Sequence, residues 1–304
     1  MNWRSCLNVL DKVLVLTGPT GVGKTKLSIY LAKKYNGEII SGDSIQVYKG
    51  MNILSAKIKE GEKEGVPHHL IDILDINEDC NVYLFQQLVR SKIKEITERG
   101  HLPIIVGGTG LYLIASLYDY NFFETSDENT YDDLSDDEVY KLLEVKDPLE
   151  ASKLHPHNRK RVVRALNIIE SSGKTKQEIN DAQEHKLKYD ALFICLTKDR
   201  EQLYEDINKR VDIMFEEGLV DEVKYLETLN PSRNARQAIG YKEFLPYFDG
   251  QITLDEVKEQ IKKNTRKFAK RQFTFFRHQL PVKFFDKKDV DEIDEYIRGW
   301  YEHE

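Results

Sequence analysis

The feature that most constrains the fold is a glycine-rich stretch near the N-terminus. Gly18 to Thr25 reads Gly-Pro-Thr-Gly-Val-Gly-Lys-Thr, which matches the pattern Gly-x-x-x-x-Gly-Lys-Thr. The apolar run Val13 to Leu16 before it predicts a buried strand, and Lys26 to Tyr35 behind it has apolar residues at helical spacing. A strand, a glycine-rich loop and a helix N-terminus in this order form a phosphate cradle, because the loop amides and the helix dipole both favour an anion.

This loop predicts a site for a phosphate with a magnesium ion. Lys24 adds a positive charge, and the hydroxyl of Thr25 can hold Mg²⁺. We therefore expect Mg²⁺ as the cofactor, with Thr25 as its protein ligand. The predicted phosphate-binding residues are Gly18, Pro19, Thr20, Gly21, Val22, Gly23, Lys24 and Thr25.

The length and composition limit the number of domains and the cellular location of the protein. With 304 residues, the chain can form one elaborated domain or a domain with an insertion. We find no apolar run of membrane-spanning length and no secretory signal, and we expect no membrane partner. Three scattered cysteines, Cys6, Cys80 and Cys195, argue against a disulfide framework or a zinc site. They favour a reducing, cytoplasmic location and a role as small buried apolar groups.

The order of predicted elements indicates an α/β protein with a P-loop parallel sheet core flanked by helices. Strands alternate with helices in the first third of the chain, as parallel sheets require. A strand-free stretch then predicts a helical insertion domain, and strand character returns at Ala191 to Leu196. We assign residues 1–120 and 189–304 to the core and residues 121–188 to the insertion. Within 189–304, we expect one helix from Tyr241 to Phe248 and a long one from Leu254 to His278.

Three turns are expected at one edge of this sheet. Ligands bind beyond the carboxyl ends of parallel strands. The loop Gly18–Thr25, the pair Asp43–Ser44 and the turn Gly107–Thr109 each follow a predicted strand. We therefore expect these segments to line one site.

Asp43 is open to two interpretations. It could cap a helix together with Ser44 or act as an outer partner of Mg²⁺, or it could be a general base that faces a nucleophile near the phosphate. The acid that hydrolysing P-loop enzymes carry at the end of another strand is missing, because the strand Pro103–Val106 runs into Gly107-Gly-Thr-Gly110. The cradle could therefore hold a pyrophosphate that does not belong to a nucleotide.

Charge is distributed unevenly along the chain. The net charge is −7, yet residues 262–277 contain seven bases and no acid, while residues 124–138 contain eight acids and no base. The bases of the first stretch predict a phosphate-tracking face on a helix whose aromatic residues are core. A second cluster, Lys160, Arg161 and Arg164, lies in the insertion, and two basic surfaces suit a nucleic acid. The pair His68-His69 lacks a third metal ligand at suitable spacing and predicts a structural role.

Taken together, the motifs resemble those of the tRNA dimethylallyltransferase (isopentenyltransferase) family over nearly the whole chain. The ordered set is more specific than any single motif. It comprises Gly18-Pro-Thr-Gly-Val-Gly-Lys-Thr25, Asp43-Ser-Ile-Gln-Val-Tyr-Lys-Gly-Met51, Pro67-His-His-Leu-Ile-Asp-Ile-Leu74, Gly107-Gly-Thr-Gly-Leu-Tyr112, Arg161-Val-Val-Arg-Ala-Leu166, Ile239-Gly-Tyr-Lys-Glu243 and Ala269-Lys-Arg-Gln272.

The resemblance implies transfer of a dimethylallyl group from dimethylallyl diphosphate to N6 of the adenosine immediately 3′ of the anticodon in tRNA. It implies Asp43 as the base, with Thr25 and Arg210 as the other catalytic residues, and the glycine-rich loop as the diphosphate site. The anticodon stem-loop would be the macromolecular partner of a chain that we expect to be a monomer. The implied tRNA-binding residues are Asp43, Ser44, Ile45, Gln46, Thr109, Lys160, Arg161, Arg164, Gly240, Tyr241, Lys270, Arg271, Gln272 and Arg277.

The sequence departs from the family pattern in three places. The usual Asp-Ile-Gly-Thr-Ala-Lys stretch is Asn52-Ile-Leu-Ser-Ala-Lys57, a usual Trp is Phe275, and the stretch Asn77–Tyr83 lacks the usual Tyr-Ser pair. None of these positions lies in the phosphate cradle. Two other functions stay open at this point, prenylation of free adenine nucleotides and an ATP-binding nucleotide kinase or RNA-binding switch.

Overall fold

The computed structural model describes residues 10–120, 130–181 and 185–303. The chain divides into two compact units, one made of Met1–Tyr118 with Leu187–Glu304 and the other of Asp119–Lys186. The second unit corresponds to the expected insertion, and its bounds fall two residues before the expected 121 and 188.

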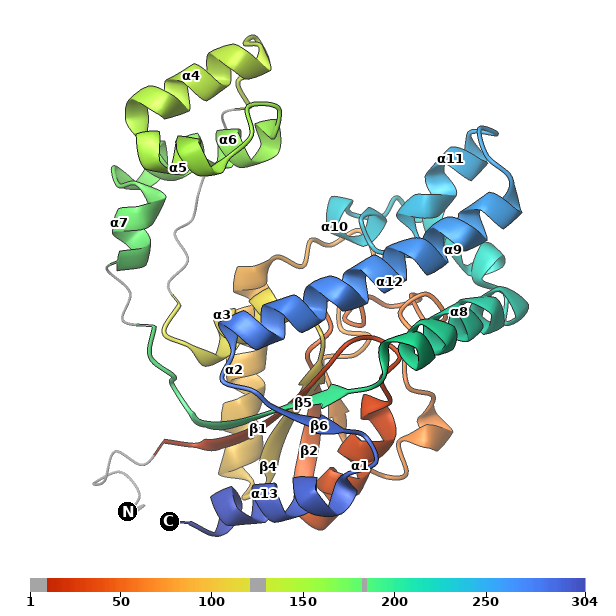
Figure 1. The fold of residues 1–304 in the computed structure, drawn as a ribbon. Coiled ribbons are helices and arrows are strands. Elements are labelled where there is room, and N and C mark those ends of the chain that lie inside the picture. The colour runs from red at the N-terminus through yellow and green to blue at the C-terminus, as the bar shows by residue number, and fades with distance from the viewer. Residues whose placement is uncertain (1–9, 121–129, 182–184, 304) are drawn as a thin grey trace. The chain divides into compact units, whose positions relative to one another are not determined.

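The first unit is built on a six-stranded sheet in which every strand pairing is parallel (Figure 1). The strand order is β3-β2-β4-β1-β5-β6, which confirms the predicted α/β fold with a parallel sheet. The edge strand β3 was not expected from the sequence. The strands are β1 (Lys12–Thr17), β2 (Gly37–Ser41), β3 (His68–His69), β4 (Leu102–Gly107), β5 (Asp190–Thr197) and β6 (Lys283–Asp286).

The sheet is covered on both faces, which explains the continuous apolar runs of its central strands. Val13 and Val15 of β1 face one hydrophobic core, and Leu14 and Leu16 face the other. Helices pack against each face, and further helices extend the unit beyond the sheet. The helices of this unit are α1 (Lys24–Lys34), α2 (Val82–Glu98), α3 (Gly110–Leu117), α8 (Arg200–Glu216), α9 (Leu219–Glu227), α10 (Arg233–Arg236), α11 (Leu245–Phe248), α12 (Leu254–Gln279) and α13 (Val290–Glu302), with short 3₁₀ turns η2 (Glu60–Glu62) and η3 (Lys242–Phe244).

The expected helix from Tyr241 to Phe248 is wrong as a single element. The segment forms η3 and then the four-residue α11, whose first turn contains Pro246. Proline suits the first turn of a new helix but cannot donate the backbone hydrogen bond that a continuous helix needs.

In its described residues between 130 and 181, the insertion unit consists of helices joined by turns, with no strand. Its own small core includes Val139, Leu143, Val162 and Leu166. Ser135 begins α4 with a capping box that also uses Glu138. The first part of the acidic stretch, residues 124–129, lies outside the described residues. The helices are α4 (Asp136–Lys146), α5 (Pro148–Lys153), α6 (Arg159–Ser172) and α7 (Lys176–Asp181).

Two expectations from composition can be compared with the structure. Cys80 and Cys195 are free and buried, as expected, while Cys6 lies outside the described residues. In the described parts of the chain, no helix has both the length and the apolar character needed to span a bilayer.

Candidate active site

The turns that follow β1, β2 and β4 line one cavity of about 540 Å³. Lys24 and Thr25 come from the glycine-rich loop, Asp43 follows β2, and Thr109 follows β4. Because these strands are neighbours in a parallel sheet, their carboxyl ends meet at one edge. The expectation that the three turns share an edge is confirmed.

The loop has the backbone that a phosphate cradle needs. Gly18 has a φ of +143°, and a Cβ there would lie 2.8 Å from the carbonyl oxygen of Leu196. A side chain at this position is therefore excluded by both conformation and space. The loop ends at Gly23, the N-cap of α1, so the amides at the start of this helix border the cavity.

Lys24, Arg210 and Asp43 line this cavity close enough to influence one another's charges. The ammonium of Lys24 donates hydrogen bonds to the carbonyl oxygens of Gly18 and Pro19, each at 2.9 Å. Burial, with a further contribution from the guanidinium of Arg210, lowers the pKa of Lys24 to about 8. Burial also lowers the pKa of Arg210, against an opposing effect of the Asp43 carboxylate. The Lys24 ammonium is thus held in place before any anion binds.

Asp43 combines features of both interpretations offered by the sequence. Its Oδ1 accepts a hydrogen bond from the backbone N–H of Ile45 at 2.9 Å, so the carboxylate does stabilise the local turn. The half-buried side chain also lines the cavity. The bond to Ile45 orients the carboxylate and leaves acceptor capacity for a substrate proton.

The surroundings of Thr25 fit a magnesium ion that is bound mainly by the oxygens of a diphosphate. The Thr25 side chain lines the cavity, and the residue is exposed. Across the described residues, no group of three or more His, Cys, Asp and Glu is arranged to bind a metal. A magnesium ion here would therefore rely on the Thr25 hydroxyl, diphosphate oxygens and water, which suits its preference for oxygen ligands and retained water.

Several of the residues predicted to bind tRNA border the same cavity. Ser44, Ile45, Gln46, Thr109 and Gly240 line it together with Asp43. Tyr241 does not, because its side chain is fully buried and its hydroxyl donates to Glu227. Tyr241 was predicted to bind tRNA, but its side chain is part of the hydrophobic core.

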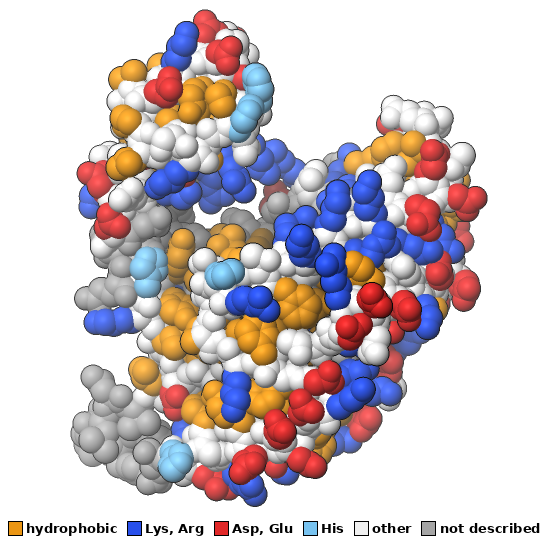
Figure 2. Space-filling view, in the orientation of Figure 1, with side chains coloured by type: hydrophobic (Ala, Val, Ile, Leu, Met, Phe, Trp, Pro, Cys, Tyr) orange, Lys and Arg blue, Asp and Glu red, His pale blue; other side chains and the backbone are white. Residues whose placement is uncertain are grey.

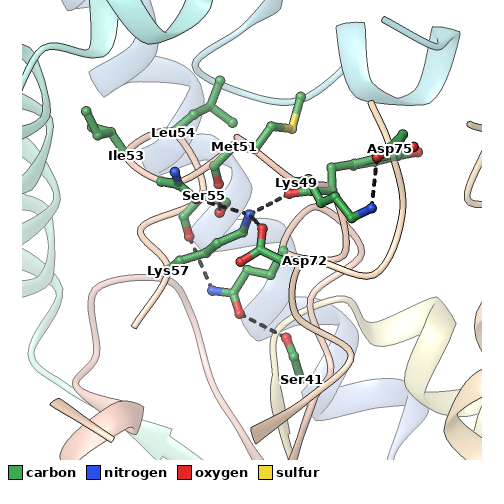
Figure 3. A network of polar contacts seen from close by, with 12 residues as sticks. Ser41, Lys49, Met51, Ile53, Leu54, Ser55, Lys57, Asp72 and Asp75 are labelled. Atoms are coloured by element: carbon green, nitrogen blue, oxygen red, sulfur yellow. Dashed lines mark hydrogen bonds and ion pairs between the residues drawn. The ribbon is translucent and has the colours of Figure 1, made fainter. Parts of the chain in front are cut away.

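Gln46 is bonded to Ser41 and Ser55, and a separate polar cluster around Lys57 lies next to Ser55 (Figure 3). Oε1 of Gln46 accepts from the Ser41 hydroxyl at 2.9 Å, and its Nε2 donates to the carbonyl of Ser55 at 3.3 Å. The Lys57 ammonium, in a side chain only 5% exposed, contacts the Asp72 carboxylate and the Tyr48 carbonyl. The altered stretch Asn52–Lys57 is therefore an ordered wall of the site.

A second anchor fixes the start of this stretch. The carboxylate of Glu222, in α9, accepts hydrogen bonds from three consecutive backbone amides, those of Asn52, Ile53 and Leu54, at 2.8 to 3.1 Å. The sequence offered no signal for either anchor, because both depend on partners that are distant in the chain.

Replacing Lys57 with methionine should lower the free energy of unfolding by about 1–3 kcal/mol, since it leaves a buried carbonyl and a carboxylate without their donor. Urea unfolding measures this change. Lys49→Met is the control, because Lys49 forms a comparable pair with Asp75 at 3.0 Å in which both side chains are more than half exposed. Equal stability losses in the two variants would contradict a structural role for the Lys57 network.

The basic face of α12 is smaller than the sequence indicated. Lys262 pairs with Asp212 at 2.9 Å and with Glu259 at 3.0 Å, and Arg266 donates to Asn208, so these two bases are engaged within the protein. Figure 2 shows Lys and Arg side chains gathered over α12. We call the five exposed bases of the predicted stretch the α12 cations: Lys263, Lys267, Lys270, Arg271 and Arg277.

The expected aromatic core of α12 is only partly correct. Phe276 and Ala269 are buried, as predicted. Phe268 instead lines the cavity, and the guanidinium of Arg271 lies 5.8 Å from the centre of its ring. An aromatic face beside a cation suits a nucleic-acid base.

The basic cluster of the insertion is exposed within its own unit. Lys160, Arg161 and Arg164 project from α6 at spacings that place them on neighbouring turns. Arg159, by contrast, is bound to Asp136 at 3.0 Å.

The histidine pair has the structural role that the sequence favoured. His69 contacts the Glu38 carboxylate at 2.6 Å, and Nδ1 of His68 lies 2.8 Å from the Val66 carbonyl oxygen. Both residues form the edge strand β3, and in the described part of the chain they belong to no group of three or more potential metal ligands.

Comparison with known proteins gives consistent matches over nearly the whole chain. The family model described as IPP transferase matches residues 46–279. The tRNA dimethylallyltransferase of Anoxybacillus flavithermus is 52% identical over 302 residues, covering 95% of this chain and 97% of that protein.

Solved structures agree with these sequence matches. The full-length tRNA isopentenylpyrophosphate transferase from Bacillus halodurans has a TM-score of 0.74 at 43% identity, covering 96% of this chain and 97% of that one. A eukaryotic dimethylallyltransferase acting on tRNA has a TM-score of 0.81 at 33% identity, covering 95% of this chain and 77% of that one. The chain therefore belongs to the IPP transferase family of tRNA dimethylallyltransferases.

Proposed function

We propose that this protein transfers a dimethylallyl group from dimethylallyl diphosphate to N6 of the adenosine immediately 3′ of the anticodon in tRNA and releases pyrophosphate. Beyond family membership, the observation that supports this most is the meeting of Lys24, Arg210 and Asp43 in one cavity. We also expect a cytoplasmic monomer.

The cations serve the leaving group. Breaking the bond between the dimethylallyl carbon and the diphosphate oxygen builds negative charge on the pyrophosphate. The loop amides, Lys24 and Arg210 stabilise that charge because they are already in position. Mg²⁺ held by Thr25 would neutralise further charge on the same oxygens.

Asp43 serves the nucleophile. The lone pair of an exocyclic adenine amine is delocalised into the ring, so N6 attacks well only if its proton is accepted as the new C–N bond forms. The Asp43 carboxylate takes that proton, while its bond to the Ile45 amide keeps it oriented. The N6–H bond and the C–O bond to the diphosphate break. An N6–C bond and an O–H bond on the Asp43 carboxylate form, and pyrophosphate leaves with the electrons of the C–O bond.

The target adenine must leave its stack to reach this cavity. Ser44, Gln46 and Thr109 border the space it would enter, and Phe268 offers a ring face. The α12 cations, with Lys160, Arg161 and Arg164 of the insertion, would contact the phosphates of the anticodon stem-loop.

A transfer assay tests the proposal. Purified protein is incubated with Mg²⁺, dimethylallyl diphosphate and unmodified tRNA, and the nucleosides of the digested tRNA are separated. Dimethylallyl adenosine at the position 3′ of the anticodon is the expected product. A preference for AMP over tRNA in competition would indicate prenylation of free nucleotides, and phosphate release from ATP without prenylation would indicate a kinase or switch. Either result would overturn the proposal.

Replacing Lys270 with alanine should weaken tRNA binding and reduce the slope of log affinity against log salt by about one ion. The physical reason is that one exposed cation no longer displaces a counterion from the RNA. The measurement is a binding titration at several salt concentrations.

Lys262→Ala is the matched control for this measurement. It removes the same charge from the same helix, but Lys262 is already neutralised by Asp212 and Glu259. Its salt slope should equal that of the unaltered protein. If Lys262→Ala lowers the slope as much as Lys270→Ala, the division of α12 into engaged and exposed bases is incorrect.

A further inference from the structure

Gln272 joins three segments that are far apart in the sequence. Its side chain projects from α12, and the residue is only 6% exposed. The amide oxygen accepts a hydrogen bond from the backbone N–H of Thr20 at 3.1 Å. The amide nitrogen donates to the carbonyl of Gly108 at 2.9 Å. One buried amide thus ties α12 to the phosphate loop and to the turn after β4.

The fit at this junction is close. A Cβ added to Gly108 would lie 2.2 Å from the amide nitrogen of Gln272 and 3.4 Å from the carbonyl oxygen of Gly18. A side chain on Gly108 would therefore displace the Gln272 amide, while the turn lies in van der Waals contact with the phosphate loop. A displacement of α12 at this point would have to break the Gln272 bonds or move the loop with it, because buried polar groups rarely go unpaired.

The residues beside Gln272 in the chain point to the solvent. Lys270 and Arg271 are exposed members of the α12 cations, and Arg271 also lines the cavity. A single turn of α12 therefore carries cations suited to RNA phosphates and an amide bonded to the loop that surrounds the diphosphate site. The sites proposed for the two substrates share this turn.

We propose that Gln272 is a positioning residue that couples the two substrates, so that tRNA held by the α12 cations fixes the Thr20 amide and strengthens binding of dimethylallyl diphosphate. This inference rests on the proposed function. It replaces the sequence-based expectation that Gln272 itself contacts tRNA, because both polar ends of its buried amide are already bonded within the protein. By linkage, the diphosphate strengthens tRNA binding by the same factor.

Calorimetry with both substrates tests the coupling. Dimethylallyl diphosphate and Mg²⁺ are titrated into the protein alone and into its complex with an anticodon stem-loop whose target adenosine is replaced by purine riboside, which lacks the amine and does not react. In the unaltered protein, the RNA should tighten diphosphate binding by about 5- to 150-fold. Gln272→Met keeps the length of the side chain without its hydrogen bonds. In this variant, the ratio of diphosphate affinity with RNA to diphosphate affinity without RNA should lie within about twofold of one. The affinity without RNA should change by less than about threefold.

Gln202→Met is the matched control, since it makes the same substitution at an exposed position near the start of α8 and should keep the full ratio. If thermal melting shows that Gln272→Met is unfolded, Gln272→Glu takes its place under the same criterion, because it keeps an acceptor for Thr20 but faces the Gly108 carbonyl with a carboxylate. An unchanged ratio in the folded variant, or a ratio of one in the unaltered protein, overturns the coupling.

The failure of this inference is distinguishable from the failure of the proposed function. The unaltered protein is assayed in parallel for prenylation of a stem-loop that carries adenosine. Prenylation with an unchanged ratio in the Gln272 variant contradicts only the coupling. Absence of prenylation under all conditions contradicts the proposed function itself.

Discussion

Asp43→Asn is expected to lower the turnover number for tRNA prenylation by about 10²- to 10⁴-fold, the usual contribution of a general base. The amide cannot take the proton from N6 at neutral pH. The affinity for dimethylallyl diphosphate should change little, because the anion is held mainly by the loop amides, Lys24 and Arg210. Single-turnover kinetics separate the two effects, since they report the chemical step at saturating substrate.

This substitution also separates the two roles of Asp43. Asparagine keeps the side-chain oxygen that accepts from the Ile45 amide, so the turn should survive. If Asp43 served only to stabilise that turn, the variant would retain its turnover. Asp75→Asn is the control, because Asp75 is an exposed acid paired with Lys49 and does not line the cavity. It should prenylate at the rate of the unaltered protein.

The fold could be predicted largely because its central strands are buried on both faces. Such strands need apolar residues at every position, and Val13–Leu16 and Ala191–Leu196 show this without an alternating pattern. Strand β3 gave no such signal. It consists of two histidines that are held by a bridge to β2 and by Glu38, so its structure depends on its neighbours.

The candidate site likewise has a part that the sequence predicts and a part that it does not. The phosphate loop is contiguous in sequence and its chemistry follows from its motif, so the cradle could be predicted. The polar anchors could not, because each joins positions that only the fold brings together. Lys57 and Asp72 are 15 residues apart, and Gln272 is 252 residues from Thr20. Local sequence likewise did not reveal that Lys262 finds its partner Asp212 on another helix.

Lys24→Met should reduce the turnover number by about 10²- to 10³-fold, in line with the loss of one preorganised donor to the developing charge. Diphosphate affinity should fall as well, because the ammonium also faces the ground-state anion. Lys26→Met is the control. It removes one charge from the same turn of α1 at an exposed position that does not line the cavity, and should change both quantities far less.

The pH dependence of diphosphate binding tests Lys24 without altering the cavity. Burial and Arg210 lower the pKa of Lys24 to about 8 in the free protein, and a bound diphosphate must raise it, because negative charge favours the ammonium. Binding then takes up a proton above pH 8. Affinity should be greatest below pH 8 and fall by up to about tenfold per pH unit above it, until the pKa of the complex is reached. The diphosphate itself is already fully ionised in that range, since its last pKa is about 6 by analogy with phosphate monoesters. Calorimetry between pH 7 and 9.5 should therefore show the decline in the unaltered protein and in Lys26→Met, and a flat profile in Lys24→Met. A decline that persists in Lys24→Met would assign the titration to another group and remove Lys24 from the role proposed for it.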